Sequence, residues 1–176
     1  MAKIAPPFNL YEWIEKNKNL LKPPVGNKNL YVESGDYIVM IVGGPNARKD
    51  YHYNETEELF FQIKGDIVVK TQQEGKMQKV FIKEGEMFLL PAKVPHSPIR
   101  SKDSIGLVIE KKREPHHKDG LMWFSETENA LLFEEYFHLT NIEKDFLPVF
   151  KKFYQSEKLR TCPVSGEIMD ADERYI

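Results

Sequence analysis

The sequence predicts a mainly β protein, a small sandwich or barrel of antiparallel strands, and two observations lead to this prediction. Between Asn29 and Glu110 the chain runs in short apolar or alternating segments, which are typical of strands. Turn signals such as KGD, QEGK and KEGE separate these segments, and frequent strands joined by tight turns favour a closed or two-sheet architecture. The 176 residues are enough for one sizeable core and few for two full domains.

A short helix is predicted at the start of the chain. In the segment NLYEWIEKNKNLLKPP, apolar residues recur at about helical spacing; they are Leu10, Trp13, Ile14 and Leu21. The KPP that closes this segment ends the pattern, because proline disfavours helix in the residue before it. The strands are expected next, in the segments LYVESGDYIVMIVGG, ELFFQIKGDIVVKTQQEGKMQKVFIKEGEMFLLP and SIGLVIEKK.

After Glu110 the sequence changes character. The segment KKREPHHKDG is charged and predicts irregular chain. Further on, apolar residues recur at three and four residues, as in an amphipathic helix that Pro148 would bend; they are Ile142, Phe146, Val149, Phe150 and Phe153. We therefore expect one domain over residues 1–176, with a barrel core over about residues 29–112 and a C-terminal extension over about residues 113–176.

Composition excludes several classes of partner. The 25 basic and 27 acidic residues leave a net charge of -2, which gives no electrostatic footprint for nucleic acid. The longest apolar run, Tyr37 to Val42, is far short of the roughly 20 residues that a membrane-spanning helix needs. The single cysteine, Cys162, allows no internal disulfide, and no targeting segment is expected. We expect a soluble cytoplasmic protein without nucleic acid or membrane partners.

Two blocks of the predicted strands have a recognisable spacing. The first places His52, Asn54 and Glu58 between two glycines, and the second runs from a glycine through Pro91 to His96 and on to a basic residue. These blocks resemble the paired motifs of the cupin superfamily. The resemblance implies a double-stranded β-barrel, or jelly roll, with a metal on its axis. With the helices predicted above, the expected fold is this barrel with a short N-terminal helix and a C-terminal helical extension.

The match to the cupin motifs has three departures. Asn54 stands where many cupins have a second histidine, Lys93 where many have a glycine, and Arg100 where an asparagine is usual. His52, Glu58 and His96 remain as candidate metal ligands. Two neutral imidazoles and one carboxylate on one face of a ferrous ion leave adjacent positions open for a chelating substrate and dioxygen.

The polar residues of these blocks have other possible roles. Taken singly, His52 and His96 are more often hydrogen-bonded core or surface residues, and Glu58 could be an exposed strand end. A carboxylate buried beside apolar neighbours is costly without a compensating partner, and the agreement of both blocks favours the ligand reading. In extended chain, His96 and Arg100 share a face, so a guanidinium pointing into the same cavity implies an anionic substrate.

Longer segments give a closer resemblance. LLKPPVGN, VMIVGGPNARKDYH, EELFFQIKGD, IKEGEMFLLPAKVPHSPIR and GLVIE, in this order, resemble the 3-hydroxyanthranilate 3,4-dioxygenase family over about Tyr11 to Cys162. This resemblance implies an iron enzyme that opens the ring of 3-hydroxyanthranilate with O2. The product would be 2-amino-3-carboxymuconate semialdehyde, on the kynurenine route to quinolinate and NAD. A homodimer is also implied.

The resemblance assigns roles to particular residues. One Fe(II) per subunit would be held by His52, Glu58 and His96. Substrate and catalytic contacts would come from Arg48, Arg100 and Glu110, with Glu58 also touching the substrate. The substrate carries a carboxylate, which a planar guanidinium binds in bidentate fashion, and Arg100 is our candidate for that contact. Glu110 would accept a proton or a hydrogen bond from the chelating groups.

One feature of the family is altered here. Many microbial members carry a second, rubredoxin-like iron site built from two C-x-x-C pairs. Ser125, Glu128 and Ser165 stand where three of these thiolates are expected, which leaves Cys162. Because serine is a poor substitute for thiolate in a tetrahedral site, we expect no second metal. His116, His117 and His138 are expected at the surface without metal roles.

Other functions remain open from the sequence. A non-catalytic cupin that binds a small aromatic acid would keep the barrel and lack the reaction. A metal-dependent isomerase, or a dioxygenase for another ortho-aminophenol, would use the same three ligands with different substrate groups. Arg48 and Arg100 favour a carboxylated substrate among these alternatives. A purely structural module would not explain two arginines beside three ligand-type residues.

Overall fold

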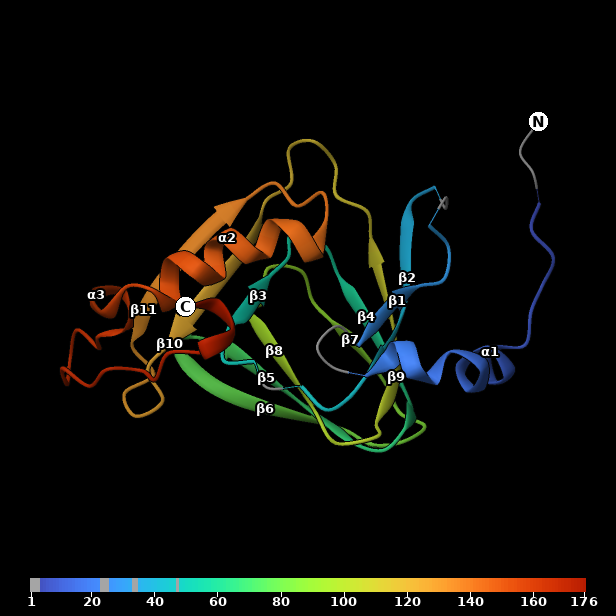
Figure 1. Ribbon diagram of the computed structural model, residues 1–176, viewed down its shortest axis with the longest axis horizontal. Helices are drawn as coiled ribbons and strands as arrows, with labels where there is room; N and C mark the ends of the chain where they lie inside the picture. The colour runs from blue at the N-terminus through green and yellow to red at the C-terminus, as the bar shows by residue number, and fades with distance from the viewer. Residues whose placement is uncertain (1–3, 23–25, 33–34, 47) are drawn as a thin grey trace.

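Two antiparallel sheets form the centre of the computed structural model, which describes residues 4–22, 26–32, 35–46 and 48–176 (Figure 1). The five-stranded sheet has the spatial order β1 (Asn27–Asn29), β2 (Tyr37–Gly43), β9 (Ile105–Lys111), β4 (Glu58–Lys64) and β7 (Met87–Leu90). The six-stranded sheet has the order β11 (Leu131–Phe137), β10 (Asp119–Phe124), β3 (Tyr51–Tyr53), β8 (His96–Arg100), β5 (Ile67–Gln73) and β6 (Lys76–Ile82). The predicted mainly β fold is confirmed.

The strands bury alternate residues, as the period of a β-strand requires. In β4, Glu58, Phe60 and Gln62 are buried, and in β5, Ile67 and Val69 are buried. The inward residues of both sheets form one apolar core; they are Met40, Phe60, Ile67, Val69, Ile82, Leu90 and Val108. The inner faces of the sheets therefore close on each other, and polar residues on the same faces are also removed from water.

The predicted N-terminal helix is confirmed as α1 (Leu10–Asn17), which continues into a 3-10 turn over Lys18–Leu21. Asn9 caps the helix, since its side chain accepts a hydrogen bond from the Glu12 backbone N–H. Ile14 and Leu21 pack with Ile41 of β2 in a separate small cluster. The two prolines of the predicted stop lie outside the described residues.

The chain beyond Glu110 differs from the prediction of irregular chain followed by helix. The loop after β9 ends at Lys118, and β10 and β11 then extend the six-stranded sheet, with β10 paired to β3. The sheets therefore reach beyond the predicted barrel core of about residues 29–112. Most of β10 is buried on both faces, so its sequence lacks the alternation that identifies a half-buried strand.

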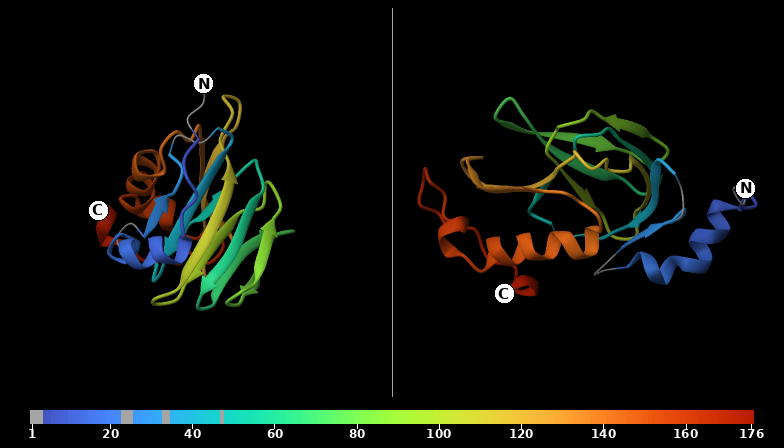
Figure 2. Two further views of the ribbon diagram at one scale, coloured as in Figure 1. Left: turned by 90° about the vertical axis from the view of Figure 1, so that its right-hand side faces the viewer. Right: turned by 90° about the horizontal axis from the view of Figure 1, so that it is seen from above.

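The predicted C-terminal helix is confirmed as α2 (Ile142–Tyr154), and a short α3 (Glu157–Arg160) and a 3-10 turn (Glu173–Tyr175) follow it. Phe146, Val149, Phe150 and Phe153 pack on Leu121 and Trp123 of β10 in a second core. The side chain of Ile142 lies outside the described residues. Pro148 lies inside the helix. In Figure 2 both helices lie on the same side of the sheets in the left-hand view, and the right-hand view shows α2 and α1 toward opposite ends of the molecule. No helix among the described residues is both long and apolar enough to cross a membrane.

Candidate metal and substrate site

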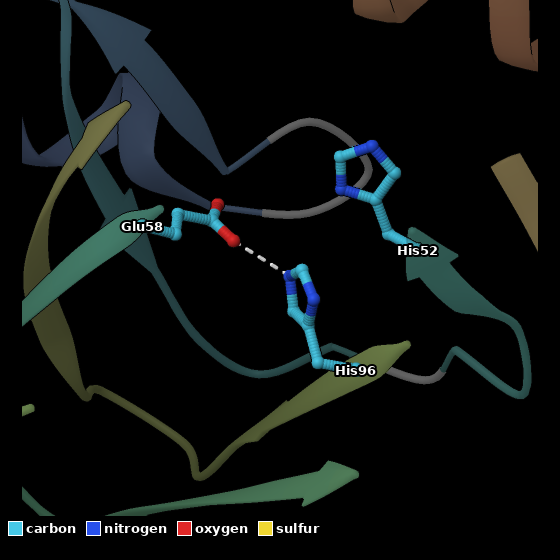
Figure 3. Close-up of side chains that lie close together, drawn as sticks. All are labelled: His52, Glu58 and His96. Atoms are coloured by element: carbon cyan, nitrogen blue, oxygen red, sulfur yellow. Dashed lines mark ion pairs between the residues drawn. The ribbon is translucent and has the colours of Figure 1, made fainter. Parts of the chain in front are cut away.

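His52, Glu58 and His96 meet between the two sheets (Figure 3). His52 lies in β3 and His96 begins β8, and these two residues pair directly across the six-stranded sheet. Glu58 begins β4 in the opposite sheet and faces inward with Phe60. All three side chains are buried, and one ligand-type atom from each lies within 4.8 Å of the others. The structure thus brings together the three residues that the motif spacing singled out.

The contact between His96 and Glu58 calls for a cation. The Nδ1 atom of His96 lies 3.1 Å from the Val94 carbonyl oxygen, so in the neutral imidazole Nδ1 donates there and Nε2 keeps its lone pair. That Nε2 atom lies 2.6 Å from Glu58 Oε2 (dashed line in Figure 3). Glu58 Oε2 has no hydrogen-bond partner in the described part of the chain. Two lone pairs at this distance are stabilised by a positive charge between them.

His52 is held from its far side. Its Nε2 atom lies 2.7 Å from Asp119 Oδ2, and because an ionised carboxylate only accepts, Nε2 donates and Nδ1 keeps a lone pair. Metal-binding histidines commonly donate their other ring N–H to a carboxylate in this way. His52, Glu58 and His96 therefore fit a divalent transition metal bound by two imidazoles and one carboxylate.

The protonation states at this site suit metal binding, which needs neutral imidazole and ionised carboxylate. Burial lowers the pKa of His52 below its ordinary value, although the Asp119 carboxylate acts in the opposite direction. Burial alone would raise the pKa of Glu58, but the hydrogen bond and charge of the neighbouring His96, with a smaller effect of His52, hold it well below its ordinary value. A neutral His52 and an ionised Glu58 are thus favoured near neutral pH.

Arg100, the last residue of β8, places a guanidinium in the same interior. Its side chain is buried, and its Nη1 atom has no hydrogen-bond partner among the residues that the structure describes. Burial lowers the pKa of Arg100 to about 10, with a further lowering from Arg48 and an opposing effect of Glu58. The group is still charged at neutral pH, and a buried charge with an unused N–H is suited to an anionic ligand.

Arg48 has a different environment. Its guanidinium forms an ion pair with the buried Asp50 and lies 5.8 Å from the centre of the Phe146 ring. Burial would lower the pKa of Arg48, but the Asp50 carboxylate raises it above the ordinary value. Arg48 therefore lies between β3 and α2 with one partner already in place. Its predicted contact with substrate stays a prediction.

Glu110 is buried. The charged segment that follows it in the sequence, KKREPHHKDG, would by composition favour an exposed strand end. It lies in β9 directly opposite Glu58 in β4, and its Oε2 atom accepts a hydrogen bond from Arg113 Nη1 at 2.5 Å. Burial and the charge of Glu58 raise the pKa of Glu110 well above its ordinary value, against the opposing effect of Arg113. Glu110 therefore holds a proton more readily than an exposed glutamate does.

Two residues of this region were not singled out from the sequence. Asp119 contacts His52, and Arg113 bonds to both Asp119 and Glu110. Both belong to the KKREPHHKDG segment, which reads as a solvated loop because it is charged. One feature of the sequence could have indicated their burial. The segment lies between Glu110, at the end of one predicted strand, and an apolar run, so both of its ends are expected to lie close to the sheets.

The candidate second metal region is compact around Cys162. Cys162 is buried, and hydrogen bonds from Ser165, from the Val164 backbone and from Ser125 lower the pKa of its thiol to about 7. Glu128 is exposed. The expectation of no metal here stays a prediction.

A second group of ligand-type side chains lies at the surface. Glu114, His116 and His117 have ligand-type atoms within 4.8 Å of one another. His116 and His138 are exposed, as expected.

Comparison with known proteins places the chain among named relatives. The family model described as 3-hydroxyanthranilic acid dioxygenase matches residues 1–154. The chain is 54% identical over 172 residues to a 3-hydroxyanthranilate 3,4-dioxygenase of Xanthomonas campestris pv. campestris, covering 98% of this chain and 97% of that protein. It is 41% identical to a protein of the same name from Neurospora crassa, covering 95% of this chain and 92% of the relative.

A solved structure is also similar. It is a cupin-2 domain containing protein from Shewanella frigidimarina, with 19% identity and a TM-score of 0.47, and the match covers 56% of this chain and 92% of that one.

Proposed function

The chain belongs to the 3-hydroxyanthranilic acid dioxygenase family, and from this premise we propose the chemistry of its site. Ring opening of 3-hydroxyanthranilate by O2 is the activity, with 2-amino-3-carboxymuconate semialdehyde as the product. We place it on the kynurenine route to quinolinate and NAD. The observation that carries the proposal is the convergence of lone pairs from His52, Glu58 and His96 in a buried site.

We propose that these three residues hold one Fe(II) per subunit. When bound, ferrous iron supplies adjacent open positions for the hydroxyl and amino groups of the substrate and for O2. This assignment is supported by the neutral His52 and by Glu58 Oε2, which has no hydrogen-bond partner among the described residues. The outer partners of the two imidazoles, Asp119 and the Val94 carbonyl, fix the ring orientations.

The remaining residues bind and orient the substrate. Arg100 would pair its Nη1 donor, which has no partner in the described part of the chain, with the substrate carboxylate. Arg48, at the edge of the site beside Phe146, would complete the positive side of the cavity. Glu110, whose pKa is raised, would hold or release the proton of a chelating group. Glu58 would lie against the substrate, since it stands directly opposite Glu110.

We further propose a homodimer that works in the cytoplasm. The lone cysteine suits a reducing compartment. The outward face of β4, β7 and β9 carries apolar side chains, among them Leu59, Phe61, Met87 and Leu89, and the last two are exposed. A contiguous apolar face of this kind is suited to a second copy of the chain.

The dimer is tested by light scattering of wild type and of Met87→Glu, which places a charge on the apolar face. We expect twice the chain mass for wild type and the chain mass for Met87→Glu. A monomeric wild type would contradict the dimer.

The activity is tested by absorbance of the ring-opened product. Iron is loaded anaerobically and quantified, and 3-hydroxyanthranilate and O2 are then added to wild type, His96→Ala and His138→Ala. His138 is the matched control because it is an exposed histidine that bonds to a backbone carbonyl. We expect product from wild type and His138→Ala and none from His96→Ala. Iron-loaded wild type without product would refute the assignment, and binding without turnover would indicate a cupin that only binds aromatic acids.

A further inference from the structure

Arg113 is buried between two carboxylates that belong to different parts of the site. It lies in the loop between β9 and β10, and the exposed fraction of its side chain is 3%. Its Nε and Nη2 atoms donate to Asp119, at 2.9 Å to Oδ1 and 2.6 Å to Oδ2, while Nη1 donates to Glu110 Oε2 at 2.5 Å. One guanidinium therefore binds both groups.

Each of these carboxylates has a second contact in the site. Asp119 Oδ2 accepts from His52 Nε2, and the exposed fraction of Asp119 is 1%. Glu110 faces Glu58 across the strand pair β4 and β9. The contacts form a continuous chain from His52 through Asp119 and Arg113 to Glu110. A change in the position of Arg113 would therefore reach both ends of this chain.

We propose that Arg113 is a positioning residue that orients His52, through Asp119, and Glu110, directly, at the same time. The inference rests on the proposed function, in which His52 binds the metal and Glu110 contacts the substrate. A planar fork of N–H donors is needed, because two donors must meet Asp119 side by side while a third meets Glu110. Lysine offers one compact ammonium group and cannot reproduce this arrangement.

A simpler role for Arg113 would be to tether the loop between β9 and β10. A buried guanidinium between two carboxylates compensates their charge, and removing it destabilises a fold whatever the site does. A tether alone predicts lower stability with unchanged metal affinity. A positioning role predicts a change at the metal even in protein that remains folded. Metal affinity and the melting temperature of the metal-free protein therefore separate the two roles.

The test uses Arg113→Lys, Asp119→Asn and Glu110→Gln in the full chain. Metal-free proteins are titrated with Co(II) against a competing chelator, the visible Co(II) spectrum is recorded, and KM for 3-hydroxyanthranilate is measured after iron loading. Arg160→Lys is the matched control, because the Arg160 guanidinium bonds to the backbone carbonyls of Tyr154 and Met169 and to no carboxylate among the described residues. Melting temperatures of the metal-free variants are measured in parallel.

The three variants should give different results. Loss of an outer partner of a metal-binding histidine typically weakens metal binding by about 10- to 100-fold. We expect Arg113→Lys to weaken Co(II) binding by about tenfold or more, to change the Co(II) spectrum and to raise KM. Asp119→Asn should change Co(II) binding mainly, and Glu110→Gln should change KM mainly. Arg160→Lys should change neither.

Two outcomes would overturn the inference, and they are distinguishable. If wild type binds Co(II) and Arg113→Lys binds it equally well with an unchanged spectrum, Arg113 is only a tether, and the proposed function stands. If wild type binds no Co(II), the proposed function is contradicted, and the inference about Arg113, which rests on it, is contradicted as well. Should Arg113→Lys not fold, Arg113→Gln, which keeps one amide donor, replaces it under the same two criteria.

Discussion

At the scale of single residues, Gly106 of β9 lies against the buried Arg100 guanidinium. A Cβ atom added at this position would lie 2.8 Å from Arg100 Nη1 and 2.8 Å from Gln62 Oε1. Both neighbours are buried, so neither side chain can swing into solvent. The space that glycine leaves free is therefore occupied by the guanidinium that we assign to the substrate carboxylate.

We predict that Gly106→Ala displaces the Arg100 guanidinium and raises KM for 3-hydroxyanthranilate roughly tenfold, equivalent to about 1.4 kcal/mol of binding free energy. Co(II) affinity should remain close to that of wild type. The control is Gly35→Ala, since a methyl group there meets no atom within 4 Å among the described residues beyond its chain neighbours. Steady-state kinetics and Co(II) titration check this prediction. An unchanged KM would contradict the proposed contact between the Arg100 guanidinium and the substrate.

The site was only partly predictable at this scale. The spacing of the two blocks identified His52, Glu58 and His96, because ligand types at fixed positions on neighbouring strands leave a pattern in the sequence. The contact of His52 with Asp119 joins residues separated by 67 positions, and no local pattern encodes such a contact. The resemblance gave Glu110 a contact with the substrate, whereas composition alone favours an exposed strand end there, because its partner in the fold, Arg113, lies in a segment whose composition is that of a surface loop.

At the scale of elements, the N-terminus of α2 is fixed by two side chains. Asn141 caps the helix, and Asp145 accepts hydrogen bonds from the Thr140 and Asn141 backbone N–H groups at 2.7 Å each and from Thr140 Oγ1 at 2.8 Å. The hydrogen bonds from the Asn141 and Thr140 backbones lower the pKa of Asp145 below its ordinary value. A carboxylate here is also favoured by the positive end of the helix dipole.

Asp145→Ala should lower the free energy of unfolding by about 1 kcal/mol at neutral pH. The pKa of this carboxyl is lower in the folded protein than in the unfolded chain, so its contribution is complete above the unfolded value of about 3.9 and is lost as pH falls through the folded value. Urea unfolding at pH 7 and pH 3 checks both points. The exposed Asp170, changed to alanine, serves as the control. A difference that persists unchanged in acid would contradict the charged-cap explanation.

The elements were predictable where their patterns were regular. α1, α2 and the hairpins of the barrel have clear periods, and the structure has them close to the expected bounds. β10 is nearly continuous in apolar residues because α2 covers one face and the sheet interior covers the other. Such a run cannot be assigned to helix or strand by its period alone.

At the scale of the whole molecule, two separate cores support the two halves of the six-stranded sheet. One core fills the space between the sheets, and the other joins β10 and β11 to α2 (Figure 1). Phe153 is fully buried in the second core and stacks on Trp123 with ring centres 4.3 Å apart. Phe146, in the same core, lies 5.4 Å from the His52 ring, so this core forms one wall of the site.

Phe153→Ala should lower the free energy of unfolding by about 3–5 kcal/mol, as expected for a large aromatic side chain removed from a packed interior. Because Phe146 transmits the change to His52, metal affinity should also fall in the folded variant. Denaturant unfolding and Co(II) titration measure these effects. Phe81→Ala is the control, since Phe81 is 66% exposed. A loss below about 1 kcal/mol would show that the second core is more plastic than its packing indicates.

The pairing of β3 with β8 has a consequence for the mechanics of the six-stranded sheet. In the described residues, one pair, His52 with His96, forms the register between these two strands, whereas β5 and β8 pair over five residues from Ile67 to Thr71. The six-stranded sheet is therefore weakest between β3 and β8. The proposed ion would bind His52 and His96 and so link the two strands. Metal-free protein should exchange the amide hydrogens of β3 and β8 faster than metal-loaded protein, with β5 and β6 little changed. Loss of iron would then weaken the barrel between β3 and β8. Local unfolding of the metal-free enzyme would therefore begin at its own active site.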